Sequence, residues 1–198
     1  MWHSQSGQDK LVSELLGNKR SGFFIDLAAN EPVSISNTLA LERDFGWNGL
    51  CIEGNPHWWF PLSHRKCDLV GAVISDYDDE SILFSGQNNG LAGIVNPAFD
   101  NQDRAGANVK HGVSFSTVLS MFGVPRTIDY LSLDVEGAEF AIMENFPFEA
   151  YNIRVITVER PSDKLKQLLS KHGYRFKTSS YNTHGDELWI GPEGHITN

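Results

Sequence analysis

FFIDLAANEPVSISNT, residues 23–38, places an apolar run directly before a polar turn and a helical pattern. This order predicts a β-strand, a loop and a helix, the layout of many nucleotide-binding loops. The turn contains no glycine, the residue that most readily adopts positive φ angles and lets a ligand approach the backbone. Asn tolerates the left-handed region better than most residues, so we expect Asn30 to supply the special conformation that Ala28 and Ala29 cannot.

Outward from this segment, apolar runs alternate with helical patterns along most of the chain. The alternation predicts an α/β fold with a doubly wound, mostly parallel sheet and helices on both faces. Ser36 or Asn37 can cap the first helix, and Gly46 can end it. Strands are predicted at 22–28, 49–53, 68–75, 80–84, 127–134 and 152–159. Helices are predicted at 38–45, 57–66, 114–123, 137–146 and 163–172. Ser162 can cap the last of these helices, and Gly173 can end it.

The last part of the chain departs from the alternation. Residues 174–180 and 187–191 flank the turn-rich segment 181–186, which predicts a terminal antiparallel hairpin. A parallel sheet closed by such a hairpin is the Rossmann-like arrangement of the class I S-adenosylmethionine-dependent methyltransferases, whereas nicotinamide-binding Rossmann domains usually end with another parallel strand.

Composition restricts the possible partners. The 198 residues fit a single domain, 1–198, and 40% hydrophobic residues are enough for a substantial core. A net charge of −9 with only 16 Lys and Arg residues opposes a nucleic-acid backbone, so we expect a small-molecule partner, no nucleic acid and no membrane. The sequence carries no signal for an oligomeric state.

Location and redox setting follow from two further observations. The chain has no apolar run of about 18 residues, and its first residues lack the pattern of a secretory signal, so we expect a soluble, cytoplasmic protein. Cys51 and Cys67 both lie in apolar, strand-like stretches, where a buried reduced thiol is the commoner state. A cytosol-like redox setting is the expectation.

Asp26, Glu53, Ser75 and Asp134 fall at or near the ends of predicted strands. In open α/β sheets, ligands bind beyond the carboxyl ends of the strands. Glu53 ends the second strand, a position that suits a carboxylate accepting hydrogen bonds from the two hydroxyls of a ribose. A solvated acid at a strand end is the alternative. The glycine-free loop disfavours a dinucleotide more than S-adenosylmethionine, because the latter has no pyrophosphate that needs bare backbone amides.

Several segments together resemble the FkbM-type methyltransferases: SQSGQD at 4–9, FFIDLAAN at 23–30, SNTLALE at 36–42, GWNGLCIEGNP at 46–56 and IDYLSLDVEGAE at 128–139. The resemblance spans nearly the whole chain. Members of this family are class I methyltransferases that use S-adenosylmethionine, and many methylate hydroxyl groups on sugars or natural products. The resemblance therefore implies S-adenosylmethionine as the cofactor and a carbohydrate or other small-molecule hydroxyl as the acceptor.

The resemblance also implies positions for the cofactor. Residues 26–31 surround its methionine part, Glu53 holds the ribose, 73–75 flank the adenine and 134–136 face the sulfonium. The cofactor-binding residues expected on this basis are Gln5, Asp26, Ala28, Asn30, Ser36, Asn37, Thr38, Glu53, Gly54, Asn55, Val73, Ile74, Ser75, Asp134, Val135 and Glu136. The commoner family form has GAND followed by G, where this chain has Ala28, Glu31 and Pro32. That difference motivates an alternative function: a catalytically weak or inactive relative that serves as a binding module.

Methyl transfer to a hydroxyl requires alignment with the sulfonium and removal of a proton, so a carboxylate near the methyl group is expected. We predict Asp134, Glu136 and Glu159 as catalytic residues. Glu139 lies in the first turn of a helix, where stabilisation of the helix dipole explains it equally well. Asp134 and Glu159 could hold a divalent cation, but no third ligand is identified, so no metal is predicted. An ion pair of Glu159 with Arg160 or Arg154 is the alternative.

Residues outside these motifs have weaker signals. Gln5, Gln8 and Asp9 are expected to cover the cofactor or substrate, with helix capping by Ser4 or Ser6 as the alternative.

Trp58 and Trp59 could stack near the adenine, although we expect at least one to pack in the core. His111 could be a base, but a surface position fits a lone histidine better. The Gly- and Asn-rich stretch 85–110 is predicted to be a long loop, of which 86–108 would form a lid or part of the acceptor pocket; disorder is its alternative.

Overall fold

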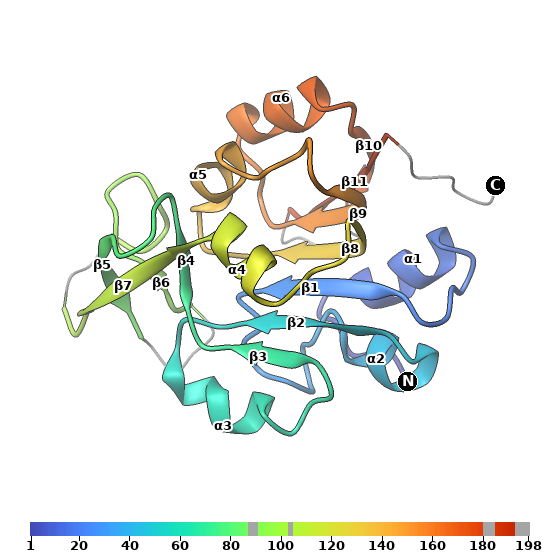
Figure 1. The fold of residues 1–198 in the computed structure, drawn as a ribbon, viewed down its shortest axis with the longest axis horizontal. Helices are drawn as coiled ribbons and strands as arrows, with labels where there is room; N and C mark the ends of the chain where they lie inside the picture. Colours follow the sequence, from blue (N-terminus) through green and yellow to red (C-terminus); the bar gives the residue numbers. More distant parts are fainter. Residues whose placement is uncertain (87–90, 103–104, 180–184, 193–198) are drawn as a thin grey trace.

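A computed structural model describes residues 1–86, 91–102, 105–179 and 185–192. Within these ranges a seven-stranded sheet has the order β10-β11-β9-β8-β1-β2-β3 (Figure 1). Neighbours from β3 to β9 are parallel, while β11 is antiparallel to both β9 and β10. The predicted mostly parallel sheet with a terminal hairpin is confirmed. Its strands are β1 (Phe23–Leu27), β2 (Asn48–Ile52), β3 (Asp68–Val70), β8 (Thr127–Leu133), β9 (Asn152–Val158), β10 (Arg175–Ser179) and β11 (Glu187–Ile190). Of the predicted turn 181–186, residues 181–184 lie outside the described residues.

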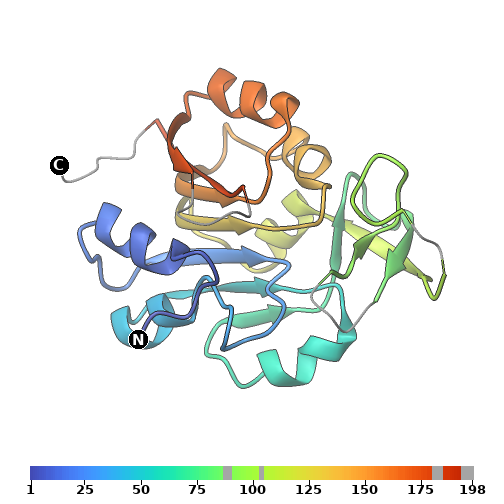
Figure 2. The same ribbon diagram turned by 180° about the vertical axis from the view of Figure 1, so that it is seen from behind.

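Helices cover both faces of this sheet (Figures 1 and 2). Side chains of successive strand residues point to opposite faces, so Phe24 and Tyr130 join one core cluster while Ile25 and Leu131 join another. Burial on both faces explains why the strands have nearly continuous apolar runs. One face carries α1 (Gln8–Leu15), α2 (Leu39–Phe45), the 3-10 turn η1 (Pro56–Trp58) and α3 (Trp59–Leu62), and the other carries α4 (Phe115–Met121), α5 (Glu139–Glu144) and α6 (Asp163–Lys171).

The helix ends follow local sequence signals. The hydroxyl of Ser162 accepts a hydrogen bond from the backbone N of Leu165 and so caps α6, as predicted. The Ser36 hydroxyl accepts one from the backbone N of Leu39, and Gly46 ends α2 with a φ of 70°. Helix α1 begins after Gly7, which has no side chain to cap it, but the Ser4 hydroxyl accepts a hydrogen bond of 3.3 Å from the backbone N of Asp9 in the first turn. The capping alternative therefore holds for Ser4.

The predicted strand 68–75 is two strands in two different sheets. β3 belongs to the main sheet, whereas β4 (Val73–Ser75) pairs with β7 (Asn108–Ser114) in a second sheet of order β4-β7-β5-β6. The chain turns at Gly71, where an added Cβ would meet the indole of Trp59 at 2.9 Å. Figure 1 shows this second sheet beyond the arrowheads of β1, β2 and β3.

The stretch 85–110 is only partly a loop. β5 (Ser81–Ser85) confirms the predicted strand at 80–84, but β6 (Gly93–Ile94) and the start of β7 lie where the sequence predicts irregular structure. Residues 87–90 and 103–104 of this stretch lie outside the described residues. The short β6 is held by antiparallel pairing of Ile94 with Phe84, a contact that no local pattern reveals.

Cys51 in β2 and Cys67 just before β3 form a disulfide, with their Cα atoms 6.2 Å apart. The expectation of two reduced thiols is wrong, and with it the argument for a cytosol-like setting. The cysteines lie on strand ends that become neighbours only through the parallel pairing of β2 with β3. None of the helices in the described ranges is long and apolar enough to cross a membrane.

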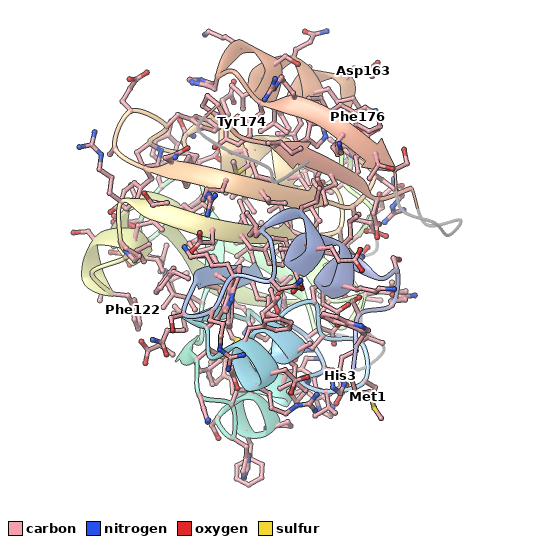
Figure 3. The ribbon with its side chains drawn as sticks, turned by 90° about the vertical axis from the view of Figure 1, so that its right-hand side faces the viewer. Met1, His3, Phe122, Asp163, Tyr174 and Phe176 are labelled. Carbon is pink, nitrogen blue, oxygen red and sulfur yellow. A yellow bond between two sulfur atoms is a disulfide. The ribbon has the colours of Figure 1, made fainter. Side chains whose placement is uncertain are left out.

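The chain's first residues lie at one side of the molecule. The amino group of Met1 is 3.1 Å from Oδ2 of Asp44 on α2. Figure 3 shows Met1 and His3 far from Phe176, which belongs to the edge strand β10.

Candidate active site

The carboxyl ends of β1, β2 and β8 meet at one polar cleft of about 730 Å³. Parallel strands deliver these ends to the same edge of the sheet, as open α/β folds require. Eight of the predicted site residues line the cleft: Gln5, Asp26, Ala28, Asn30, Asn37, Glu53, Asp134 and Glu159.

An apolar pocket of about 390 Å³ adjoins the polar cleft and shares Ala28, Glu53 and Ala92 with it. Its walls include Phe84 and Ile94 from the second sheet. Four more predicted residues line this pocket: Gly54, Val73, Ile74 and Val135. The two compartments together can hold an elongated ligand with one polar end and one flat apolar end.

The loop after β1 reaches its conformation without glycine. Ala28 has a φ of 62° and Asn30 a φ of 51°, both in the left-handed region. The expectation for Asn30 is confirmed, but the expectation that Ala28 cannot adopt this conformation is wrong. The backbone N–H groups of Ala28 and Ala29 both donate to the carbonyl of Ile52, at 2.9 and 3.1 Å, and these bonds hold the loop against β2.

Glu53 lies where the two compartments join. Its Oε2 accepts a hydrogen bond from the backbone N of Asn30 at 2.8 Å, and its Oε1 accepts one from that of Asn55 at 2.6 Å. Burial raises the pKa of Glu53, while these two hydrogen bonds oppose the rise. Each carboxylate oxygen has a second lone pair, so the side chain can still accept from a ligand.

Asp26 lies in the polar cleft, beside Ser132 on the neighbouring strand. Its Oδ2 accepts a hydrogen bond of 2.6 Å from the hydroxyl of Thr38. Burial raises the pKa of Asp26, and the hydrogen bond from Thr38 and the charge of Arg65 oppose that rise. Thr38 and Ser36 themselves do not line either compartment; they lie behind Asp26.

Three further predicted residues lie away from both compartments. The Asn55 side chain accepts from the backbone N of His57 and begins the η1 turn. The Ser75 hydroxyl donates to the carbonyl of Tyr77, and Ser75 lines a separate pocket between the second sheet and α5. Glu136 is buried but does not line the cleft.

Asp134 and Glu159 bring two carboxyl groups together at the ends of β8 and β9. Burial raises the pKa of Asp134 well above its ordinary value, and the charge of Glu159 raises it further. Burial also raises the pKa of Glu136 to about 7, again with help from Glu159. A carboxylate whose pKa is raised in this way takes up a proton more readily than an exposed one, as a general base must.

A single arginine contacts three acids beside the cleft. Nη2 of Arg160 lies 2.7 Å from Asp100, 2.8 Å from Glu159 and 3.5 Å from Glu136. The predicted ion pair of Glu159 with Arg160 is therefore present. Oxygen atoms of Asp100, Glu136 and Glu159 lie within 4.8 Å of one another, a spacing that could hold a cation, whereas Asp134 of the pair considered from the sequence does not belong to this group. The guanidinium already compensates their charge.

The remaining candidates divide between structural and cleft positions. Oε1 of Glu139 accepts hydrogen bonds from the backbone N atoms of Val135 and Gly137, so this acid holds the turn before α5. His111 is exposed on β7 and does not line the cleft. Trp58 lines the cleft, whereas Trp59 donates from Nε1 to the carbonyl of Glu53.

Gln5, in the segment before α1, and Gln8, the first residue of α1, both line the cleft, where the sequence places them. Asp9 does not line it. Its carboxylate instead accepts hydrogen bonds from the backbone N atoms of His3 and Ser4 and from the Ser4 hydroxyl, and so folds the first residues back on α1.

Sequence reasoning missed Ser132 and Asp186, which also line the cleft. Ser132 lies in β8 two residues before Asp134, which directly follows the strand, so the period of two places both side chains on one face. Asp186 directly precedes β11, and an antiparallel strand begins at the edge where its parallel neighbours end. Nε2 of Gln8 donates to Oδ2 of Asp186 at 2.6 Å, which joins the two ends of the described chain over the cleft.

Two buried polar atoms at the cleft lack a hydrogen-bond partner among the described residues: Oδ1 of Asn37 and Nε1 of Trp58. A buried polar group without a partner is costly, which indicates that a ligand or water completes it. The acidic polar compartment suits a cationic group, Glu53 suits a diol and the apolar compartment suits a flat ring. These features fit the parts of S-adenosylmethionine.

Comparisons with known proteins agree with this geometry. Residues 26–176 match the family model described as the methyltransferase FkbM domain. Among solved structures, the chain is similar to the precorrin-6y C5,15-methyltransferase of Geobacter metallireducens GS-15, with a TM-score of 0.51 and 10% identity over 92% of this chain and 86% of that one. It is also similar to the METTL16 MTase domain, with a TM-score of 0.50 and 12% identity over 93% of this chain and 66% of that one. At these identities the solved structures show the fold alone. No curated protein sequence matches the chain.

Proposed function

The chain belongs to the FkbM methyltransferase family, and we propose on that premise that it transfers a methyl group from S-adenosylmethionine to a hydroxyl of a carbohydrate or other neutral small molecule. The observation that carries the proposal is the convergence of the ends of β1, β2 and β8 on one cleft with a polar and an apolar compartment, joined at Glu53. The residues of both compartments match the chemistry of this cofactor.

Each part of the cofactor has a counterpart in the cleft. In the proposed arrangement, Asp26 and the loop after it hold the methionine part, Glu53 holds the ribose hydroxyls, and Val73, Ile74 and Phe84 flank the adenine. When bound, the cofactor supplies an activated methyl group on a sulfonium. The protein aligns the acceptor with that methyl group and excludes water, which contributes on the order of 7–11 kcal/mol to such reactions.

Asp134 and Glu159 are the proposed acceptors of the hydroxyl proton. Burial, and then the charge of Glu159, raise the pKa of Asp134, so its carboxylate takes up a proton more readily than an exposed aspartate does. General-base assistance of this kind contributes roughly 10²–10⁴-fold to the rate. Arg160, which contacts Glu159 at 2.8 Å, orients that carboxylate.

The charge of the cleft restricts the acceptor. Among the described residues, no Lys, Arg or His lines the polar cleft. Five acidic residues do: Asp26, Glu53, Asp134, Glu159 and Asp186. An acceptor with its own carboxylate or phosphate would be repelled, because like charges at short range are unfavourable. This supports a neutral hydroxyl compound.

The alternative function is a binding module without turnover, which the alanine and proline in the segment 28–32 motivate. Isothermal titration calorimetry with S-adenosylhomocysteine separates the two at the first step. Measurable binding supports the methyltransferase. If no heat of binding is detected at millimolar ligand, the proposed cofactor is wrong and the module becomes the better account.

Glu53→Gln tests the site directly. The substitution keeps the size of the side chain and removes its charge, so the affinity for S-adenosylhomocysteine should fall by about 1–3 kcal/mol, as for other hydrogen bonds to charged groups. Glu14→Gln on the exposed face of α1 is the matched control and should leave the affinity unchanged. Equal affinities of Glu53→Gln and the unaltered protein would remove Glu53 from the ribose site.

A further inference from the structure

We propose that Arg65 is a positioning residue for the cofactor: its buried guanidinium, acting through the hydroxyl of Thr38, holds the Asp26 carboxylate in the orientation that binds the methionine part. Arg65 lines neither compartment of the cleft and lies outside every motif of the family resemblance. The inference rests on the proposed use of S-adenosylmethionine.

The contacts of Arg65 form a fork behind the cofactor loop. Nε lies 3.1 Å from Oε2 of Glu42, Nη1 donates to the hydroxyl of Ser36 at 3.0 Å, and Nη2 donates to that of Thr38 at 3.0 Å. The side chain of Arg65 is only 3% exposed. A planar guanidinium can serve these three partners at once, which a lysine ammonium on a flexible stem cannot do with the same geometry.

The direction of the hydrogen bonds follows from the donors present. Arginine donates and never accepts, so the hydroxyl oxygen of Thr38 accepts from Arg65. The single hydroxyl proton of Thr38 is then free to point to Oδ2 of Asp26, 2.6 Å away. Both hydrogen bonds, from Arg65 to Thr38 and from Thr38 to Asp26, are therefore donated toward Asp26. This direction favours an ionised carboxylate in a fixed orientation. Successive hydrogen bonds of this kind strengthen one another in a buried site.

Asp26 needs this support because its surroundings disfavour its charge. Burial opposes the ionisation of Asp26 and raises its pKa. The hydroxyls of Thr38 and Ser132 and the charge of Arg65 act in the other direction. Arg65 is the cation among these groups. Without it, Asp26 would take up a proton more readily and attract a cationic ligand less.

Stability alone does not account for a buried arginine here. The ion pair of Arg65 with Glu42 has both side chains almost fully buried, and such pairs are often no more stable than well-packed apolar residues in their place. Glu42 also accepts from the backbone N atoms of Lys66 and Cys67, so it fixes the segment that carries Arg65. The disulfide of Cys67 with Cys51 fixes that segment to β2. The fork is thus held rigidly against the loop that it orients.

Two substitutions of Thr38 test the relay. Thr38→Val keeps the shape of the side chain but removes the hydroxyl, and should weaken the calorimetric affinity for S-adenosylhomocysteine about tenfold. Thr38→Ser keeps the hydroxyl and should restore the affinity to within about twofold. In a background of Asp26→Asn, Thr38→Val should have little further effect, because the relay acts through Asp26.

Arg65→Gln should weaken the affinity at least as much as Thr38→Val does. The control is Arg43→Gln, which removes an exposed arginine that pairs with Asp44 on α2 and should leave the affinity unchanged. The Thr38 pair keeps the inference testable if Arg65→Gln does not fold. Full affinity in Thr38→Val, or equal loss in Thr38→Ser and Thr38→Val, overturns the relay while leaving the proposed function intact. Absence of binding by the unaltered protein overturns both.

Discussion

Ala28 has a left-handed backbone conformation, with a φ of 62°, in the loop after β1. This conformation costs a residue with a Cβ about 1–2 kcal/mol, whereas glycine adopts it freely. Glycine also gives the unfolded chain more freedom, which offsets part of the gain. We therefore predict that Ala28→Gly raises the free energy of unfolding by about 0.5–1 kcal/mol in urea denaturation.

Ala29→Gly is the matched control, because Ala29 is buried and is not among the residues with positive φ. There the substitution only removes a packed methyl group and adds freedom to the unfolded chain. It should lower the free energy of unfolding by about 1 kcal/mol. Changes of the same sign in both variants would contradict the conformational argument.

The raised pKa of Glu136 predicts that the stability of the protein depends on pH. Burial, and then the charge of Glu159, raise its pKa from 4.5 to about 7 in the folded protein. The folded state therefore keeps a proton that the unfolded chain has already released, so the contribution of Glu136 to stability falls as the pH rises from about 4.5 to about 7 and is constant above that.

Glu136→Gln should remove this part of the decline, because glutamine does not titrate. Urea denaturation at about pH 5 and about pH 7.5 measures the difference for the variant and the unaltered protein. Glu144→Gln, at an exposed position of α5, should leave the difference unchanged. An equal decline in the Glu136→Gln variant would show that the burial of this acid has no such consequence.

At the scale of elements, the disulfide between Cys51 and Cys67 links β2 to the segment before β3 across 16 residues of chain. Closing a loop of this length restricts the unfolded state and stabilises a protein by about 3 kcal/mol. Dithiothreitol should therefore lower the free energy of unfolding by roughly this amount. In the double variant Cys51→Ala/Cys67→Ala, dithiothreitol should have no effect; a similar loss there would mean that the reductant acts elsewhere.

Elements with local signals were predictable from the sequence. Ser162 caps the start of α6 and Gly46 ends α2. Both signals can be recognised in the sequence because capping and positive φ depend on residues within one turn. The same holds for the acids at the strand ends, since Asp26, Glu53 and Asp134 reach the cleft by the topology of any parallel sheet.

Elements that depend on distant partners were not predictable in this way. The apolar run 68–75 divides between two sheets because β4 pairs with β7, far along the chain. Asp186 and Asp100 join the site through the path of a strand and a loop, and the disulfide forms through strand pairing. Each of these contacts depends on register between separate segments, which periodicity within one segment does not encode.

At the scale of the whole molecule, the two edges of the main sheet have different roles. Near the amino ends of the strands, the buried Asp129 accepts from Nζ of Lys19 at 2.6 Å, from Nη1 of Arg154 at 3.1 Å and from the backbone N of Phe23 at 3.0 Å. This network holds β8, β9 and the start of β1 together. The cleft lies at the opposite edge.

Asp129→Asn should therefore destabilise the fold without weakening the cofactor site. Loss of the central charge leaves two cations without their partner, which should lower the free energy of unfolding by about 1–3 kcal/mol. The affinity of the Asp129→Asn variant for S-adenosylhomocysteine, measured by calorimetry, should equal that of the unaltered protein. Asp44→Asn, at an exposed pair on α2, should change neither quantity. A loss of affinity in Asp129→Asn would show that the two edges are coupled.

The antiparallel direction of β11 has a consequence for protein synthesis. Asp186 reaches the cleft only because β11 runs against its neighbours, so one wall of the cleft comes from a segment that the ribosome makes after all the other described residues that line it. Until that segment leaves the exit tunnel, Gln8 lacks its partner and the cleft lacks one of its walls. A ligand stabilises only the state that binds it. A ligand that needs the complete cleft can therefore stabilise the folded protein only after the segment with Asp186 has been made.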